Sequence, residues 1–253
     1  MASGTTVATR DRKRSDSNAV IAARVAALPW AALAESLRVR GFAVTEALLD
    51  AGTCAGLVGL YGDPARFRSR VVMERHAFGR GEYKYFSYPL PPPVGELRRA
   101  LYARLAPIAN RWHEALRNET RFPPALDEYL VQCHAAGQMR PTPLMLKYEA
   151  DGFNCLHQDL YGPLVFPLQA AILLSDPRRD FKGGEFLLVE QRPRAQSRAE
   201  VVPLRQGEAV IFAVNHRPAR GTRGCYRVAM RHGVSRVRDG RRYTLGIIFH
   251  DAA

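Results

Sequence analysis

The sequence predicts an α+β protein in which a helical N-terminal region supports a double-stranded β-helix, or jelly roll. Two observations lead to this prediction. Residues 18–141 are dominated by apolar residues at helical spacing, whereas residues 142–253 contain short apolar runs separated by turn residues. A chain of 253 residues with 47% apolar residues can build one large β-rich core. We find no internal repeat and no glycine-rich nucleotide-binding pattern.

The N-terminal segment, residues 1–17, is polar and charged and lacks the apolar stretch of a secretion signal, so we expect a disordered lead-in. No run of about 18 apolar residues is present, so no membrane span is expected. The four cysteines are widely scattered without a CxxC pair, which argues against a zinc ribbon or a disulfide framework. These features favour a cytoplasmic protein with free thiols.

The α-rich support region, residues 18–141, is expected to contain five helices and two short strands. Helical apolar spacing covers residues 18–28, 30–37, 50–61, 96–118 and 124–136. Asp50 can cap the third helix, and Pro107 is expected to kink or split the fourth. Strands are expected over residues 41–45 and 66–73.

An aromatic and basic segment, residues 78–91, interrupts this region and is predicted to be hairpin-like. Aromatic rings interleaved with cations suit both base stacking and phosphate contact. The candidate substrate-binding residues are therefore Arg80, Tyr83 and Tyr85. The alternative is that the aromatic side chains pack into the core, and the sequence leaves both open.

From residue 142 onward the pattern becomes that of short strands. The apolar runs cover residues 144–148, 166–174, 185–190, 208–213, 227–234 and 243–249. The turn signals between them are Asp151-Gly152, Lys182-Gly183-Gly184, Gln206-Gly207 and Asp239-Gly240. We assign residues 142–253 to the β-helical core.

Within this core, His157 and Asp159 are two residues apart, so on a strand their side chains project to one face. His232 follows 75 residues later and can supply a second imidazole. Two imidazoles and one carboxylate form the facial triad of non-haem Fe(II) oxygenases, which leaves coordination positions open. The sequence therefore predicts an Fe(II) site at His157, Asp159 and His232. The other histidines are expected to have surface or structural roles: His76, His113, His134, His216 and His250.

Arg242, ten residues after His232, strengthens this interpretation. Oxygenases of this class use 2-oxoglutarate, whose distal carboxylate needs a buried bidentate cation, and arginine supplies that fork. A simple hairpin at residues 239–240 would leave Arg242 ~16 Å from His232, too far for one small diacid. We therefore expect the chain to cross to the opposing sheet before Arg242. Thr244 lies on the same strand face as Arg242 and can add a hydroxyl, whereas Arg241, the competing cation, is expected to be solvated.

The motifs occur in the order Tyr148, His157-Gln-Asp159, His232 and Gly240-Arg-Arg242-Tyr-Thr244. Over residues 144–251 this order resembles the 2-oxoglutarate/Fe(II) dioxygenase superfamily, with the spacing of its prolyl-hydroxylase-like branch. The resemblance implies Fe(II) as the metal bound by His157, Asp159 and His232, and 2-oxoglutarate and O2 as cosubstrates. It also implies Arg242 as the partner of the 2-oxoglutarate carboxylate and Tyr148 as a second cosubstrate contact.

Three stretches carry a narrower resemblance: residues 148–161, 183–186 and 240–251. They are similar to a group of bacterial oxygenases described as catalysing oxidative demethylation of damaged nucleic acid, and the similarity extends into residues 78–91. The better-known alkylation-repair dioxygenases carry a second arginine where this chain has Ile248. Their iron histidine and cosubstrate arginine are also more than ten residues apart.

The net charge of +13 is concentrated in the β-rich core, where residues 178–242 hold sixteen Lys and Arg against six Asp and Glu. Such a surplus favours a polyanionic partner such as nucleic acid, and a solvated arginine-rich surface is the alternative.

Three functions remain: oxidative demethylation of alkylated nucleic acid, hydroxylation of a protein or small molecule, and non-enzymatic binding by a β-sandwich.

Overall fold

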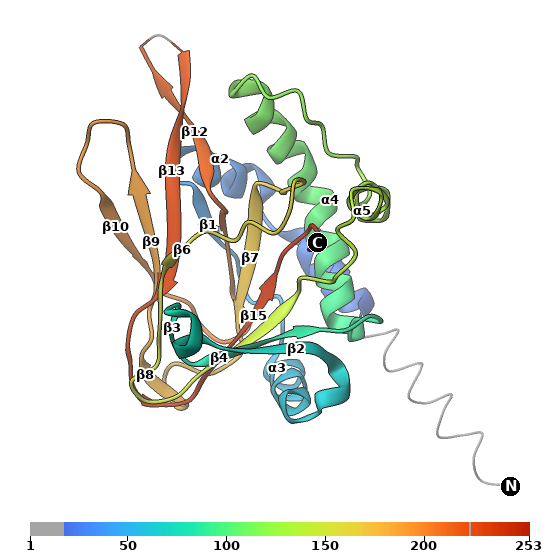
Figure 1. Cartoon of the computed structure of the whole chain (residues 1–253), viewed down its shortest axis with the longest axis vertical. Coiled ribbons are helices and arrows are strands. Elements are labelled where there is room, and N and C mark those ends of the chain that lie inside the picture. Colours follow the sequence, from blue (N-terminus) through green and yellow to red (C-terminus); the bar gives the residue numbers. More distant parts are fainter. Residues whose placement is uncertain (1–17, 223) are drawn as a thin grey trace, which may run out of the picture.

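The computed structural model describes residues 18–222 and 224–253, so the prediction for residues 1–17 lies outside the described part of the chain. Two antiparallel sheets enclose a shared apolar core, and the longest helix lies on the far side of the larger sheet (Figure 1). The mixture of helices and antiparallel sheets agrees with the predicted class.

The helices follow the predicted segments closely. They are residues 18–27, α2 (Trp30–Arg40), α3 (Ala51–Gly59), α4 (Pro92–Ala115) and α5 (Leu126–Ala135), with short 3-10 helices η1 (Leu60–Gly62), η2 (Pro64–Arg66) and η3 (Met73–His76). Asp50 caps α3 by accepting a hydrogen bond from the Thr53 amide at 2.8 Å. Pro107 does not split α4, because both Pro107 and Ala103, whose carbonyl loses its partner, face solvent.

No single helix in residues 18–222 and 224–253 is long and apolar enough to cross a membrane. The bent pair formed by residues 18–27 and α2 meets the criterion only jointly.

The larger sheet has seven strands. Their spatial order is β1 (Phe42–Val44), β11 (Ala209–Ala213), β7 (Leu168–Leu173), β15 (Arg242–Ile247), β5 (Leu144–Tyr148), β4 (Glu82–Phe86) and β2 (Phe67–Val72). The smaller sheet runs β10 (Arg198–Val202), β9 (Phe186–Gln191), β13 (Gly224–Val234), β6 (Phe153–His157) and β3 (Gly79–Arg80), with β12 (His216–Gly221) paired to β13. A separate ribbon pairs β14 (Val237–Gly240) with β8 (Phe181–Gly183).

The central strands of the larger sheet are buried on both faces, and side-chain alternation assigns each residue to one of them. On β15, Leu245 and Ile247 pack into the core shared with α4, whereas Arg242 and Thr244 line the space between the sheets. On β7, Gln169 points into that same space. Strand alternation therefore supplies polar groups to an otherwise apolar interior.

The expected crossing between sheets after His232 is confirmed. β13 ends at Val234 in the smaller sheet, β14 pairs only with β8, and β15 lies in the larger sheet. The prediction that Asp239 and Gly240 form a turn is wrong, because both belong to β14. Residues 235–236 separate β13 from β14, and Arg241 alone separates β14 from β15 in the larger sheet.

The hairpin predicted for residues 78–91 does not form. β3 pairs with β6 in the smaller sheet, whereas β4 pairs with β2 and β5 in the larger one. Gly81 separates them with φ of +140°, and a Cβ there would lie 2.9 Å from the Tyr148 ring. Only glycine permits this close approach, so the segment links the two sheets.

Two further predictions need correction. His216, predicted from its position in an arginine-flanked segment to lie in a loop, begins β12. The support region is also not purely supportive, because β1, β2 and β4 complete the larger sheet and β3 completes the smaller one. Strand pairing therefore crosses the predicted boundary at residues 141–142.

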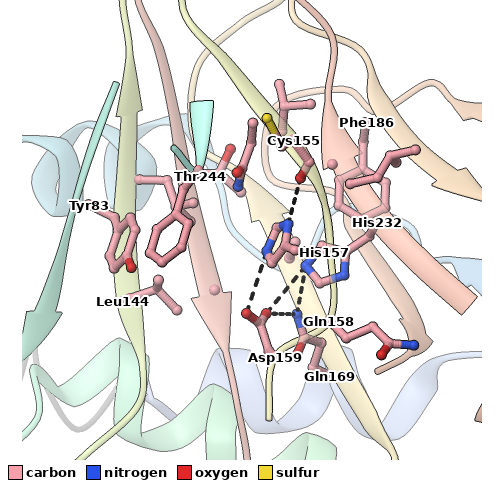
Figure 2. A pocket seen from close by; sticks show the side chains of 18 of the residues that line it. Tyr83, Leu144, Cys155, His157, Gln158, Asp159, Gln169, Phe186, His232 and Thr244 are labelled. Atoms are coloured by element: carbon pink, nitrogen blue, oxygen red, sulfur yellow. Dashed lines mark hydrogen bonds and ion pairs between the residues drawn. The ribbon is translucent and has the colours of Figure 1, made fainter. Parts of the chain in front are cut away.

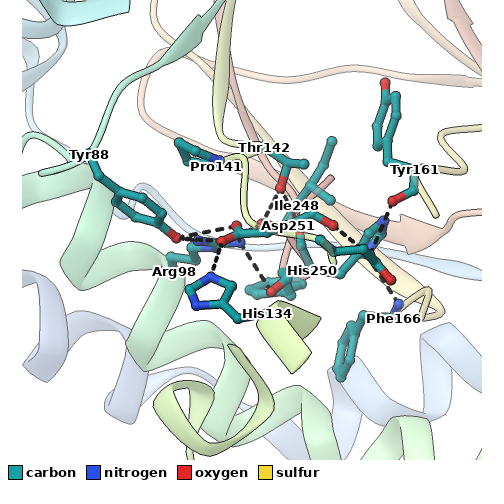
Figure 3. A network of polar contacts seen from close by, with 12 residues as sticks. Tyr88, Arg98, His134, Pro141, Thr142, Tyr161, Phe166, Ile248, His250 and Asp251 are labelled. Atoms are coloured by element: carbon teal, nitrogen blue, oxygen red, sulfur yellow. Dashed lines mark hydrogen bonds and ion pairs between the residues drawn. The ribbon is translucent and has the colours of Figure 1, made fainter. Parts of the chain in front are cut away.

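The chain end is held by a buried polar network (Figure 3). Arg98 on α4 forms an ion pair with Asp251 at 2.8 Å and donates to the carbonyls of Ile248 and Phe249. Tyr88 and His134 contact the same carboxylate at 2.9 Å each. Every guanidinium nitrogen and carboxylate oxygen of this buried ion pair thus has a hydrogen-bond partner. The pair anchors the segment after β15 to the helical layer.

Candidate metal centre

Strand pairing brings the two predicted histidines together. His157, the last residue of β6, lies directly opposite His232 on β13, and their ring centroids are 4.1 Å apart. Asp159 lies two residues beyond the end of β6. The prediction that the side chains of His157 and Asp159 project to the same face is therefore correct, but the prediction that both residues lie on a strand is not. The register of one strand pair therefore creates the cluster.

The three side chains point toward one another (Figure 2). Asp159 Oδ1 is 3.5 Å from His157 Nε2, and Asp159 Oδ2 is 3.3 Å from His232 Nε2. One ligand atom from each residue lies within 4.8 Å of the other two. A single ion can therefore contact all three.

The backbone orients one imidazole for metal binding. The Nδ1 atom of His157 lies 2.8 Å from the Cys155 carbonyl, which accepts a hydrogen bond from an Nδ1–H. This contact leaves the Nε2 lone pair directed at Asp159, as in other metal sites where the second ring nitrogen bonds a carbonyl. His232 is 6% exposed, and its Nδ1 atom has no partner among the described residues.

Two residues that the sequence did not indicate hold the carboxylate. The Tyr161 hydroxyl donates to Asp159 Oδ1, and the Gln169 amide donates to Asp159 Oδ2, both at 2.8 Å. Gln169 is a single polar residue within an apolar run, and this feature of the sequence could have indicated its role in the site. Tyr161 gave none, because its position depends on the path of the loop after β6.

Burial and the contacts among the three side chains shift the pKa of each member of the triad. Burial opposes ionisation of Asp159, but the two imidazoles outweigh it and hold the pKa of this carboxyl well below its usual range. Burial lowers the pKa of His157, but its contacts with Asp159 more than compensate, so its pKa is raised. Burial, together with the charge of His157, lowers the pKa of His232. A carboxylate beside a neutral imidazole favours binding of a cation.

The triad lines a cavity of about 350 Å³ between the sheets, and Arg242 lines the same cavity. Arg242 is 2% exposed and pairs across strands with Tyr148. It donates to the Thr244 hydroxyl at 2.5 Å, while its Nε atom has no partner among the described residues. Burial lowers the pKa of Arg242 to about 10, which still leaves a cation at neutral pH.

Arg241, the competing cation, lies outside the cavity. Its guanidinium is largely exposed and lies 3.3 Å from the Glu149 carboxylate. Arg242, by contrast, forms no ion pair within residues 18–222 and 224–253, although Glu185 lies close enough to affect its pKa. Of the two arginines, Arg242 alone offers its charge to the cavity.

Unpartnered buried atoms test whether a metal and a dicarboxylate fit here. Eight buried side-chain atoms of the described residues lack a hydrogen-bond partner, and four belong to side chains that line this one cavity. They are Tyr148 Oη, Gln169 Oε1, His232 Nδ1 and Arg242 Nε. Because orphaned buried polar groups are costly, their concentration indicates a site for a polar ligand. The imidazole and carboxylate donors suit Fe(II), and the guanidinium suits a carboxylate.

The three predicted substrate-binding residues lie in different places, and only one of them lines the cavity. Tyr83 lines the cavity, and its role in substrate binding stays a prediction. Tyr85 is 7% exposed and packs between Arg68 and Tyr161. Arg80 is exposed and lies outside the cavity, between carboxylates at 3.8 and 3.9 Å. For Arg80 and Tyr85 the structure therefore gives no place in the cavity.

The other histidines lie apart from the triad, which is the one group of potential metal ligands found among the described residues. His76 stacks on Phe78, and His134 contacts Asp251. His250 is fully buried and accepts a hydrogen bond from the Phe166 amide at 3.2 Å. His113 and His216 lie near Arg227 at a second, separate cavity.

A family model described as an oxygenase catalysing oxidative methylation of damaged DNA matches residues 81–252. An uncharacterized protein of Mycobacterium tuberculosis (strain CDC 1551 / Oshkosh) is 52% identical over 177 residues, which cover 70% of this chain and 76% of that protein. A protein of strain H37Rv matches with the same values.

Solved structures show a similar fold. A Pseudomonas putida prolyl-4-hydroxylase has a TM-score of 0.51 at 13% identity, covering 88% of this chain and 100% of its own. A Burkholderia pseudomallei oxidoreductase of the 2OG-Fe(II) oxygenase family has a TM-score of 0.50 at 19% identity, covering 88% and 93%. A prolyl 4-hydroxylase of Phytophthora capsici reaches 0.53 at 16% identity, covering 93% and 65%.

Proposed function

The chain belongs to the oxygenase family whose model matches residues 81–252, and it is therefore an oxidoreductase. From this premise we propose that it is an Fe(II)- and 2-oxoglutarate-dependent dioxygenase that demethylates alkylated nucleic acid. We also propose that the two facing sheets form a double-stranded β-helix, which the likeness to 2-oxoglutarate oxygenases supports.

One observation carries the cosubstrate assignment: a buried arginine, which has no carboxylate partner among the described residues, shares a cavity with a two-histidine, one-carboxylate cluster. His157, Asp159 and His232 would hold Fe(II). Arg242, with the hydroxyls of Thr244 and Tyr148, would hold the distal carboxylate of 2-oxoglutarate. When bound, Fe(II) and 2-oxoglutarate supply the oxidising chemistry, in which O2 and the cosubstrate yield succinate and CO2 while one oxygen atom enters a substrate C–H bond.

The protein's own contribution is to position and shield these reactants. Tyr161 and Gln169 fix both oxygens of Asp159, and Cys155 fixes the ring of His157. The apolar wall of the cavity limits the access of water to the reacting carbon. It is formed by Tyr83, Leu144, Leu146, Ala171 and Gly246.

The size of the cavity supports a small planar substrate group. At about 350 Å³ it lies at the lower end of ligand pockets, and 2-oxoglutarate would fill part of it. A methylated base could enter only after leaving its stack, as in other enzymes that act on bases. Hydroxylation of an N-methyl carbon yields a product that releases formaldehyde. The family description and the basic β-half support this substrate class.

The first experiment measures succinate and formaldehyde from the Fe(II)-loaded protein with oligonucleotides carrying different N-methylated bases. We expect both products in equal amounts with at least one lesion, and neither with the Asp159→Ala variant. Succinate without formaldehyde across all lesions would reject the demethylase and retain the oxygenase. Absence of succinate under every condition would instead favour a binding protein without enzymatic activity.

A second candidate is hydroxylation of a protein, prolyl-type, or of a small molecule. The ten-residue spacing between His232 and Arg242 favours it. Its test is a mass gain of one oxygen atom on a protein or metabolite exposed to the active enzyme.

The exposed thiols of Cys155 and Cys225 also lead us to propose a cytoplasmic location.

A further inference from the structure

The surface arginines of this chain differ in their partners. At the end of the molecule that holds β8 and β14, most surface arginines lie beside carboxylates. The ion pairs there are Arg70–Glu82, Arg80–Asp151, Arg236–Asp151, Arg238–Glu185 and Arg241–Glu149. The positive charge of this end is thus largely neutralised by the protein itself.

The opposite end carries two projecting hairpins, β9–β10 and β12–β13, which rise beyond the sheets (Figure 1). Residues 190–200 and 216–228 of these hairpins contain seven arginines and two glutamates. One of the glutamates, Glu190, is 5% exposed and is already paired with Arg217 and Arg192.

Three exposed arginines of these hairpins, which we call the hairpin arginines, are Arg194, Arg198 and Arg220. Within residues 18–222 and 224–253 none of the three takes part in an ion pair or a side-chain hydrogen bond. Arg192 lies close enough to Tyr226 to interact with it, so the two hairpins are neighbours. Within the described residues, this end therefore carries at least three arginines whose charge no carboxylate neutralises.

β13 connects these hairpins directly to the metal centre. It runs from Gly224 near the tip to His232 in the triad. Arg220 pairs with Cys225, and the seven residues from Cys225 to His232 span ~23 Å of strand. Arg198 lies nearer, because it pairs with Glu190, which lies opposite Met230. Two strand spacings and two residues separate Arg198 from His232, which amounts to ~12 Å. In a nucleic acid strand with a rise of 3.4 Å, these lengths correspond to about three to seven nucleotides.

We propose that the hairpin arginines bind the sugar–phosphate backbone of the strand whose methylated base enters the cavity, about three to seven nucleotides from that base. This inference rests on the proposed function and adds a second contact region to it. Guanidinium groups without carboxylate partners match phosphates in charge and geometry. Their distribution along two projecting ribbons suits an extended polyanion, since each phosphate can be met separately.

The test uses the full chain and two labelled single-stranded DNAs, each with one central N-methylated base: a 24-mer that reaches the hairpins and a 4-mer that does not. Binding is followed by fluorescence anisotropy over a series of salt concentrations. The variant is Arg194→Gln, Arg198→Gln and Arg220→Gln combined. The matched control is Arg70→Gln, Arg236→Gln and Arg238→Gln, which removes the same charge from the neutralised end.

For the hairpin variant we expect about tenfold weaker binding of the 24-mer at low salt. The slope of log K against log salt should shrink by about 2, since each lost phosphate contact removes about 0.7. The 4-mer should bind as before, and the control should bind both DNAs nearly as tightly as the unmodified protein. Succinate formation in the absence of DNA should be unchanged in both variants, which shows that the metal centre is intact.

Equal loss in both variants, or equal loss for both DNAs, would overturn the inference while leaving the demethylase proposal in place. Polyglutamate that competes with the 24-mer at equal charge would also overturn it and point to an acidic protein partner. If the unmodified protein binds neither DNA but forms succinate, the demethylase proposal fails as well, and the two failures are thereby distinguished.

Discussion

Two buried arginines, Arg98 and Arg242, have nearly the same exposure, 1% and 2%, but opposite surroundings. Arg98 is paired with the buried Asp251, and its remaining donors reach Tyr88 and two backbone carbonyls. Within residues 18–222 and 224–253, Arg242 has one hydroxyl partner and an unpartnered Nε atom, and it lies on a cavity wall.

The difference separates a structural ion pair from a binding site. An unpaired buried charge costs several kcal/mol, so a protein retains one where a ligand completes it. Arg217, also buried, follows the Arg98 pattern with Glu190 as its partner. Arg242 is thus the exception among the buried arginines of the described chain, and it is the one that shares a cavity with the triad.

The largest effect is expected from Arg98→Met, which leaves the Asp251 carboxylate buried and unpaired. The free energy of unfolding should fall by about 3–5 kcal/mol, measured by urea denaturation. Affinity for 2-oxoglutarate should be unchanged. The double variant with Asp251→Asn should recover part of the loss, and a loss below about 1 kcal/mol in the single variant would contradict a structural role.

Acid should weaken the same anchored region through His250. Burial lowers the pKa of His250 to about 4, against an ordinary value near 6.5. Between these two pH values His250 is protonated in the unfolded chain but neutral in the folded chain. The free energy of unfolding therefore keeps its full value above pH 6.5 and decreases as the pH falls toward 4, by up to about 3 kcal/mol. Urea denaturation at pH 7.5, 5.5 and 4.5 measures this loss, and the His250→Gln variant should show a flatter profile.

Arg242→Met should behave in the opposite way to Arg98→Met. Without a ligand its free energy of unfolding should be unchanged or higher, because an uncompensated buried cation is removed. The dissociation constant for 2-oxoglutarate should rise about 100-fold, or about 2.8 kcal/mol, in calorimetry on the Mn(II)-loaded protein. Destabilisation equal to that of Arg98→Met would show that the two arginines do not differ as we infer.

The smallest effect is expected from Gln169→Leu, which removes one hydrogen bond to Asp159. Metal affinity should fall about tenfold, at the lower end of the range for groups that orient metal ligands. Calorimetry with Mn(II) measures it, and Tyr161→Phe is the matched variant for the other oxygen. Unchanged metal affinity in both variants would show that the carboxylate is held by the strands alone.

Strand alternation explains how much of the site could be predicted. Arg242 and Thr244 were placed on one face by a spacing of two, and they line the same cavity. Gln169 was missed because an apolar run buried on both faces does not show which face meets a metal. The split of residues 78–91 between two sheets was missed because β3 is only two residues long and finds its partner in β6.

The sequence by itself determined the side chains of the candidate site: two imidazoles, a carboxylate and a guanidinium, together with the strand faces that carry the guanidinium and its hydroxyl. Local spacing encodes these features, because side chains alternate along any strand. Only the tertiary structure decided that His157 meets His232. It also decided that, among the residues the structure describes, Arg98 has a carboxylate partner whereas Arg242 and the hairpin arginines have none. Each depends on strand register and chain crossings between residues distant in sequence, which no local pattern specifies.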